Sequence, residues 1–231
     1  MTLTRRHFSL LAAAGLAAPL VQGSTAHAQM GSELMVPGPL GERSIGDPAA
    51  PVTIVEYASM TCTHCASFHT ETLPQLKENY LDTGKARLIL REFPLDPRAM
   101  AAFMLAHCAA GYEPGMDMAA LSDMDAEAST ARDERYFAVV DALFQRQRQW
   151  AFTERPVDVL LDMSRQIGLS EEAFNACLSD QALLDAVNTV KERGETEFGV
   201  EATPTFFING EELRGARDYE TMAALIDGAA R

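Results

Sequence analysis

The pattern of apolar and polar residues divides the chain into a strand–helix–strand beginning, a helical middle and a strand-rich end. The apolar, β-branched run that starts at Val52 predicts a buried strand. Apolar residues then recur at roughly helical spacing as far as Tyr80, which predicts a helix that begins near Cys62. Residues 86–93 alternate in part and predict a second strand, which Pro94 closes. This order favours two parallel strands joined by a right-handed crossover.

The middle of the chain is helical in its periodicity from Arg98 onward, over about ninety residues. Helices are predicted at residues 99–110, 136–150, 157–167 and 182–198, and a further one is predicted to open at Ser170 as its N-cap. Residues 112–132 interrupt this pattern with several acidic side chains, so an acidic surface loop is predicted there.

The end of the chain returns to strands. Residues 203–208 form an apolar, β-branched and aromatic run, and the Asn209-Gly210 pair after it is a strong hairpin signal. Residues 211–214 are therefore predicted to pair antiparallel with that run. A last helix is predicted to begin at residue 218 or 219.

This order of elements predicts an α/β fold with a helical insertion between the second and third core strands. The chain has 231 residues, of which 47% are hydrophobic, enough for one core with a large insertion. The predicted segments are a flexible N-terminal arm at 29–43, a β–α–β half at 44–97, an inserted helical subdomain at 98–185 and a β–β–α half at 186–231. The arm is predicted because its residues are rich in Gly and Pro and lack periodicity.

The first 28 residues have the features of an export signal. A basic stretch around Arg5-Arg6 precedes an uncharged apolar stretch too short to span a membrane comfortably, and Ala26-His27-Ala28 supplies a small-X-small cleavage pattern. The two arginines resemble a twin-arginine signal, and a plain secretory signal is the alternative. Export to an oxidising compartment would permit stable disulfides. The formal net charge of −14 argues against nucleic acid as a partner.

Two cysteines stand two residues apart where the first strand runs into a helix. The partial positive charge of a helix N-terminus favours a thiolate, so Cys62 is the predicted nucleophile and Cys65, one turn on, the resolving thiol of a redox-active disulfide. The alternatives are a structural disulfide or half of a zinc site. Zinc needs four ligands, and the sequence shows no second close Cys/His pair. Exchange between thiols and disulfides requires neither a metal nor an organic cofactor, so none is expected.

The motif Cys62-Thr63-His64-Cys65, followed far along the chain by Thr203-Pro204, resembles the thioredoxin superfamily. With the helical insertion, residues 42–231 resemble the DsbA-like periplasmic thiol:disulfide oxidoreductases. The resemblance implies a protein-disulfide oxidoreductase in which Pro204 is cis and lies beside the cysteines. With Thr203 it would offer backbone groups to an extended substrate segment. The alternative is a trans-proline that starts a strand.

Two more residues are candidates for the site. His64 could stabilise the Cys62 thiolate as a cation or hydrogen-bond donor, or be an exposed histidine with little effect. Glu56 lies within an apolar strand, where burying a carboxylate is costly, and the resemblance implies that it relays protons to Cys65. The alternative places Glu56 on an exposed side of the strand. His69 and His107 are interpreted as ordinary helix residues.

The other two cysteines, Cys108 and Cys177, fall on separate predicted helices of the insertion. We expect a structural disulfide between them, and two buried free thiols are the alternative. The acidic loop contains Met116, Met118 and Met124, a composition that could bind copper or simply belong to a flexible loop.

The leading functional hypothesis is a dithiol oxidase that introduces disulfides into unfolded or partly folded exported polypeptides. The resemblance implies reoxidation by a DsbB-like membrane quinone reductase. A disulfide reductase or isomerase would keep the chemistry and reverse its direction, and a periplasmic metal-binding or chaperone protein is an alternative of another class. The segment at 29–43 is short for a dimerisation domain, so a monomer is expected.

Overall fold

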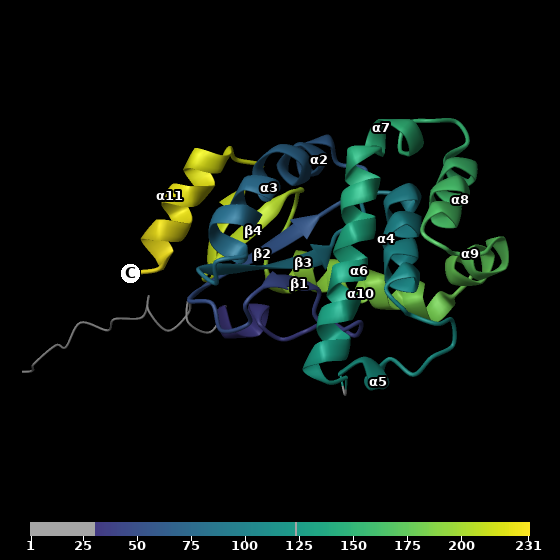
Figure 1. The fold of residues 1–231 in the computed structure, drawn as a ribbon, viewed down its shortest axis with the longest axis horizontal. Helices are drawn as coiled ribbons and strands as arrows, with labels where there is room; N and C mark the ends of the chain where they lie inside the picture. The colour runs from purple at the N-terminus through teal and green to yellow at the C-terminus, as the bar shows by residue number, and fades with distance from the viewer. Residues whose placement is uncertain (1–30, 123) are drawn as a thin grey trace, which may run out of the picture.

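A mixed five-stranded sheet lies at the centre of the computed structural model, which describes residues 31–122 and 124–231 (Figure 1). Its strands are β1 (Ser44–Gly46), β2 (Val52–Ala58), β3 (Ala86–Glu92), β4 (Thr205–Ile208) and β5 (Glu211–Arg214). Their order across the sheet is β1-β3-β2-β4-β5. Only β2 and β3 are parallel, as the strand–helix–strand pattern predicted. The predicted export signal lies outside the described residues.

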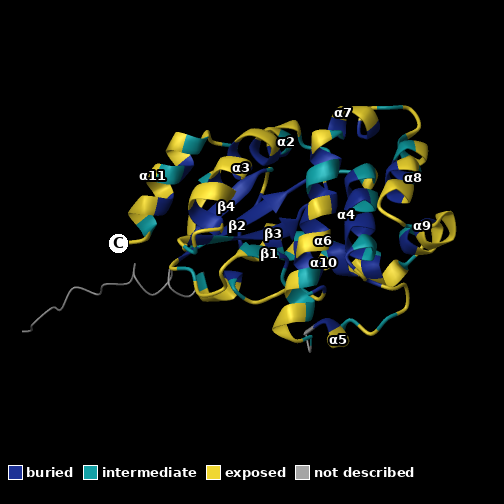
Figure 2. Ribbon diagram, viewed as in Figure 1, coloured by how far each residue is buried: buried dark blue, intermediate teal, exposed yellow. Residues whose placement is uncertain are grey.

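Strand β2 is central in the sheet, and both of its faces are covered. Ile54 and Ala58 point into the larger of two hydrophobic clusters, and Val55 and Tyr57 point into the smaller. Figure 2 shows the resulting arrangement, with a buried sheet between helices whose outer faces are exposed. Because successive side chains of a strand alternate between its faces, Glu56 shares the face of Ile54 and Ala58.

The chain continues from β2 into one long helical segment, in the pieces α2 (Thr63–Ser67), η1 (Phe68–Thr72), α3 (Leu73–Leu76) and η2 (Lys77–Leu81). The two η pieces are π-helical turns. Pro74, in α3, has no backbone N–H to donate, so the regular α-helical hydrogen-bond pattern cannot continue through it. The predicted helix is present, with Cys62 as its N-cap residue.

The helical middle consists of α4 (Pro97–Ala109), α5 (Ala119–Ser122), α6 (Ala126–Gln145), α7 (Gln147–Trp150), α8 (Pro156–Gln166), α9 (Glu171–Leu178) and α10 (Gln181–Glu197). The loop predicted to extend to residue 132 ends earlier, because Asp125 caps α6 by accepting a hydrogen bond from the backbone N–H of Ala128. Ser170 caps α9 as predicted. Helix α10 is continuous across the predicted subdomain boundary at residues 185 and 186, and it packs against both α4 and β3.

The segment before β1 was predicted to be a flexible arm, and for residues 31–43 that prediction is wrong. Leu34 and Leu40 are almost completely buried, one in each hydrophobic cluster. Arg43 is also buried, and its Nη1 lies 3.0 Å from Oδ1 of Asp133 on α6. A composition rich in Gly and Pro reflects the irregular backbone of this segment, whereas its few large side chains hold it against the sheet.

The C-terminal hairpin and the helix α11 (Tyr219–Ala229) complete the fold. Asn209 and Gly210 both have positive φ, 47° and 90°, as the turn between β4 and β5 requires. Asn209 also accepts a hydrogen bond from the backbone N–H of Thr53, which ties the turn to the start of β2. Among the described residues, none of the helices is both long and apolar enough to cross a membrane.

Candidate active site

Cys62 lies at the N-terminus of α2, directly after the short loop that follows β2. Its backbone is extended, and its carbonyl accepts the first helical hydrogen bond, from the N–H of Ala66 at 3.1 Å. The side-chain amide of Gln147, on α7, donates to the carbonyls of Met60 at 2.9 Å and Cys62 at 2.8 Å. The helical insertion therefore helps to hold the loop that carries the first cysteine, a contact that no pattern around Gln147 indicates.

A second set of bonds joins this loop to α4. The Thr61 hydroxyl donates to Oδ2 of Asp96 at 2.6 Å, and Oδ1 of Asp96 caps α4 by accepting from the N–H groups of Arg98 and Ala99. Ser59 is fully buried, and its hydroxyl accepts from the N–H of Leu95. The loop is thus held from both sides, so the position of Cys62 is set by the surrounding fold.

The two thiols of the motif differ sharply in environment. Cys62 is partly exposed and Cys65 is fully buried, and both are free thiols in this structure. The pKa of Cys62 is lowered to about 5, chiefly by a hydrogen bond from Cys65, then by the Thr203 side chain and by the backbone N–H groups of Cys65 and His64, while burial opposes the shift. The pKa of Cys65 is raised well above its ordinary value by burial, by its hydrogen bond to Cys62 and by the negative charge of Glu56.

His64 acts on the thiolate through its backbone. Its side chain is exposed, and its backbone N–H is one of the groups that lower the pKa of Cys62. This contribution follows from the position of residue 64 in the first turn of the helix, where N–H groups point outward without a helical partner. The structure therefore gives residue 64 a backbone contribution to the thiolate, and the role expected of the His64 side chain stays a prediction.

Thr203 and Pro204 lie next to Cys62, although 141 residues separate Thr203 from it. The Thr203–Pro204 peptide bond is cis, as the resemblance implied. The Cys62 thiol donates to the carbonyl of Thr203 at 3.3 Å. Pro204 itself is buried, and its carbonyl accepts from the N–H of Gly215 at 2.9 Å, which holds the start of β4 against the end of β5.

Glu56 is buried, so the alternative of an exposed carboxylate is excluded. Its Oε2 accepts a hydrogen bond from Nε2 of His69 at 3.0 Å. The interpretation of His69 as an ordinary helix residue is wrong: it lies in the π-helical turn η1 and its side chain is fully buried. Burial alone would lower the pKa of His69, but the negative charges of Glu56 and Asp141 raise it to about 9.

A second buried histidine has a structural role. Nε2 of His107, on α4, lies 2.7 Å from Oε1 of Glu92 at the end of β3, and the Tyr136 hydroxyl donates to the same oxygen at 2.8 Å. Burial lowers the pKa of His107, which favours a neutral ring that donates to the carboxylate. The interpretation of His107 as an ordinary helix residue is therefore wrong, because its buried side chain joins the insertion to the sheet.

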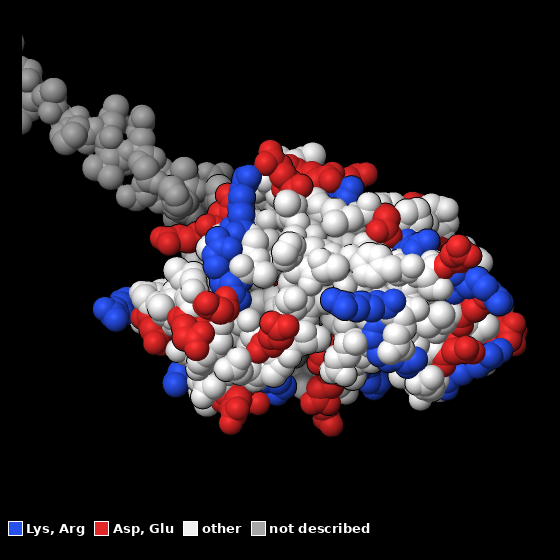
Figure 3. All heavy atoms as spheres, turned by 90° about the horizontal axis from the view of Figure 1, so that it is seen from above, with Lys and Arg blue, Asp and Glu red and all other residues white. Residues whose placement is uncertain are grey.

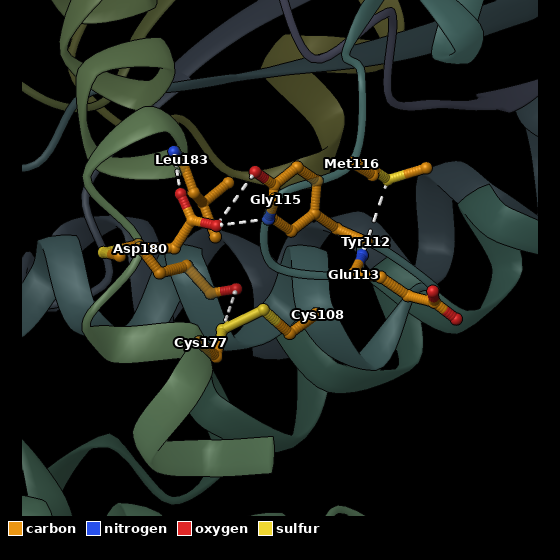
Figure 4. The surroundings of a disulfide bond; sticks show 9 residues. Cys108, Tyr112, Glu113, Gly115, Met116, Cys177, Asp180 and Leu183 are labelled. Atoms are coloured by element: carbon orange, nitrogen blue, oxygen red, sulfur yellow. Dashed lines mark hydrogen bonds between the residues drawn. A yellow bond between two sulfur atoms is a disulfide. The ribbon is translucent and has the colours of Figure 1, made fainter.

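Cys108 and Cys177 form the expected disulfide, which joins α4 to α9 (Figure 4). Near it, Oδ2 of Asp180 accepts hydrogen bonds from the Tyr112 hydroxyl at 3.3 Å and from the N–H of Gly115 at 2.9 Å, while its Oδ1 caps α10. The start of the acidic segment is thus tied to the beginning of α10. Neither cysteine is near a helix N-terminus, so neither has the environment that activates Cys62.

The methionines of the acidic segment pack against the main hydrophobic cluster. The sulfur of Met116 accepts the N–H of Glu113 at 3.4 Å (Figure 4), and the sulfur of Met124 lies 3.9 Å from a guanidinium nitrogen of Arg132. A neighbouring cation disfavours a metal ion at Met124. Within residues 31–122 and 124–231, three or more His, Cys, Asp or Glu side chains nowhere converge as a metal-binding group.

Apolar side chains are exposed on the segments that flank the cysteine loop. Leu95 is 53% exposed and follows β3 next to Ser59, while Phe152 is 58% exposed and follows α7, which carries Gln147. Figure 3 views the molecule from the end that carries α2, α7 and α11, and uncharged atoms cover much of the middle of this face. The segments on both sides of the cysteine loop therefore expose apolar surface.

The low pKa of Cys62 leads to a prediction for pH. Alkylation of the reduced protein at Cys62 is expected to accelerate with a midpoint near pH 5 and to be nearly constant from about pH 7 to pH 9, because the thiolate is then fully formed. Folding lowers the pKa of Cys62 from its ordinary value near 9 to about 5. The thiolate therefore stabilises the reduced form fully above pH 9, and this stabilisation is lost as the pH falls through about 5. Mass spectrometry of pulse-alkylated protein would measure the profile, and a midpoint near 9 would contradict it.

Comparison with known proteins gives one family. A family model described as Thioredoxin matches residues 40–124 and 116–228. The crystal structure of Wolbachia pipientis alpha-DsbA1 is 31% identical in sequence and superposes with a TM-score of 0.72, covering 87% of this chain and 96% of that one.

Two curated relatives carry names of the same kind. A putative protein-disulfide oxidoreductase of Rickettsia bellii is 26% identical over 190 residues, and one of Rickettsia conorii is 28% identical over 188 residues. Each alignment covers 80% of this chain, but only 63% and 59% of the respective relative. The chain therefore spans less than two thirds of the length of these relatives.

Proposed function

This chain belongs to the thioredoxin family, as one of its DsbA-like members, and from that premise we propose that it oxidises dithiols of exported polypeptides through Cys62 and Cys65. The observation that carries the proposal is the contrast between the two thiols: a partly exposed Cys62 whose pKa is about 5, beside a fully buried Cys65. A stabilised thiolate favours the reduced form, and a disulfide whose reduced form is stabilised is an oxidant. The direction of exchange is therefore toward oxidised substrate.

The reaction consists of two exchanges. In the oxidised enzyme, Cys62 and Cys65 are joined, and a substrate thiolate attacks the sulfur of Cys62. The bond between the two cysteines breaks, its electron pair goes to the sulfur of Cys65, and that sulfur takes up a proton. A second substrate thiolate then attacks the substrate sulfur of the mixed disulfide, and Cys62 leaves as a thiolate. The substrate has lost two electrons, and the enzyme has gained them.

Substrate binding is assigned to the surface around Thr203 and Pro204. An extended polypeptide segment would lie along this part of the chain as an added strand and present its thiol to Cys62, whose sulfur is 3.3 Å from the carbonyl of Thr203. Leu95 and Phe152 supply exposed apolar surface nearby for unfolded or partly folded chains. This arrangement favours apolar segments without a sequence-specific pocket.

The proposed place of action is the periplasm, where the predicted signal of residues 1–28 would deliver the protein. After each cycle the enzyme is reduced and needs an oxidant. We assign that role to a DsbB-like membrane quinone reductase, the partner implied by membership of the family.

The equilibrium reduction potential of the Cys62–Cys65 pair tests the proposal. In a series of glutathione buffers, the potential is expected to lie nearer to the strongly oxidising value of DsbA, about −120 mV, than to that of thioredoxin, about −270 mV, both of which are reference values. The redox state would be read by alkylation and mass. A potential near that of thioredoxin would overturn the oxidase and favour a reductase or isomerase.

A further inference from the structure

We propose that His69 and Asp141 continue the route that begins at Glu56, so that protons pass between the buried Cys65 and solvent on the far side of the helical layer. The inference rests on the proposed function, because it concerns the proton that Cys65 takes up during exchange. Cys65 is fully buried, so that proton cannot come directly from bulk water. The fold must therefore supply a path.

The inner end of the path lies in the main hydrophobic cluster. Glu56 shares its face of β2 with Ala58 and is paired across the sheet with Phe206. The ring of Phe206 packs 4.7 Å from that of Phe68, three residues after Cys65 on the same helical segment. Glu56 and Cys65 therefore lie in one apolar compartment, where the carboxylate's charge acts on the thiol with little screening.

The middle of the path is the imidazole of His69. Its Nε2 contacts Oε2 of Glu56 at 3.0 Å, and its Nδ1 lies 3.8 Å from Oδ1 of Asp141 on α6. The ring centroid lies 4.3 Å from that of Phe144 and 5.6 Å from that of Phe68, so aromatic rings flank it and carboxylates face its two nitrogens. An imidazole can accept a proton on one nitrogen and release one from the other.

Two atoms along this line lack hydrogen-bond partners. Oε1 of Glu56 and Nδ1 of His69 are buried and make no hydrogen bond in the described part of the chain. Buried polar atoms are normally paired, and exceptions ask for a reason. Here each exception lies at a position that the route uses. Oε1 is the free oxygen of the carboxylate that would serve Cys65, and Nδ1 is the nitrogen that faces Asp141.

The outer end opens to solvent. The Asp141 side chain is 48% exposed, and it lines a surface cavity of about 520 Å³ together with Lys77, Asp82 and Glu134. A small movement of the carboxylate, or one water molecule, would close the 3.8 Å gap to Nδ1. This cavity is lined by β1, η2 and α6 residues and by none of the residues assigned to substrate binding, so the route stays open while a polypeptide covers Cys62.

The proton balance follows the exchange step. When substrate breaks the disulfide, the Cys65 thiolate takes a proton through Glu56 from the cationic His69, and His69 regains one from water through Asp141. When the enzyme is reoxidised, Cys65 releases its proton along the same groups. Each cycle moves one proton inward and one outward, and the residues return to their starting states.

The test compares Asp141→Asn with Glu134→Gln, a matched control on the same helix and in the same cavity. Single-turnover oxidation of a model dithiol peptide is measured across pH 5 to 9. The Asn variant is expected to react about tenfold more slowly at neutral pH and to have a shifted pH profile, since it removes one group of an acid–base relay. The Gln control is expected to match the wild type, and Asp141→Glu to restore most of the rate.

Two further readouts separate a relay from a structural effect. The reduction potential of Asp141→Asn is expected to stay at the wild-type value, because Asp141 is remote from the disulfide. Its melting temperature is expected to fall only slightly, because the interaction lost with His69 involves a half-exposed carboxylate. His69→Gln should slow exchange at least as much as Asp141→Asn. Wild-type rates and pH profiles for Asp141→Asn would overturn the relay while leaving the oxidase intact. No exchange in the wild-type protein would refute the proposed function and, with it, the relay.

Discussion

Replacing Cys62 with serine is expected to reduce thiol–disulfide exchange to the uncatalysed rate. The hydroxyl of serine neither ionises near neutral pH nor forms a disulfide, so both the nucleophile and the stored oxidant are lost. The substitution removes one partly exposed sulfur atom and leaves the loop bonds from Gln147 and Asp96 in place. The folded structure should therefore persist. Oxidation of a model dithiol peptide by pre-oxidised protein would measure the loss.

The matched control is Cys65→Ser, which keeps the reactive thiolate and removes the resolving thiol. When its Cys62 thiolate attacks a disulfide in a model peptide and releases the other peptide sulfur as a thiolate, this variant is expected to accumulate the mixed disulfide, because no Cys65 thiol remains to displace the peptide. The adduct would be detected by mass. The pKa of Cys62 should rise in a Cys65→Ala variant, which also removes the hydrogen-bond donor, because the hydrogen bond from Cys65 is the largest cause of the lowered value. Substantial exchange activity in Cys62→Ser, or adduct formation at Cys65 in that variant, would contradict the assignment of Cys62 as nucleophile.

Replacing Cys108 and Cys177 together with alanine is expected to lower the free energy of unfolding by about 4 kcal/mol. The disulfide closes a loop between positions 69 residues apart, and in the chain-entropy description its removal gives the unfolded chain more freedom. Denaturant unfolding of the oxidised protein would measure the change. Exchange activity should remain close to that of the wild type, because Cys62 is held by bonds from α4 and α7 that do not involve the disulfide.

Reduction supplies the control for this prediction. When both proteins are fully reduced, the wild type and the double alanine variant should be about equally stable, since both then lack the crosslink and both carry Cys62 and Cys65 as thiols. A large loss of activity in the double variant at temperatures well below its unfolding would show that these cysteines take part in exchange. A change in the free energy of unfolding below about 1 kcal/mol would show that the crosslink does not reduce the conformational entropy of the unfolded chain as expected.

Much of the fold could be predicted from local patterns. The strand that starts at Val52, the helix opening after Cys62 and the Asn209-Gly210 turn all follow from the spacing of apolar residues and from backbone preferences. These signals depend on a few neighbouring residues, so they can be interpreted without knowledge of the rest of the chain. The segment before β1 was misjudged because its anchoring residues, Leu34 and Leu40, contact partners that are distant in sequence.

The residues of the candidate site also fall into two groups, those that the sequence indicated and those that only the structure revealed. Cys62 and Cys65 were found from their spacing, and Thr203-Pro204 from resemblance. Gln147 and His69 were missed, since a glutamine in one helix and a histidine in another show no local sign of their contacts with Cys62 and Glu56. A carboxylate within an apolar strand was the one available signal that a buried cationic partner existed.

By itself, the sequence determined the chemistry of this protein: a pair of cysteines at a helix start, whose spacing and N–H groups are local properties of the backbone. Only the tertiary structure decided how the two thiols differ. It buries Cys65, leaves Cys62 partly exposed beside the carbonyl of Thr203, and brings Glu56, His69 and Asp141 into one line from three separate elements. The reason is physical, because burial and charge depend on every neighbour in space, whereas sequence patterns report neighbours along the chain.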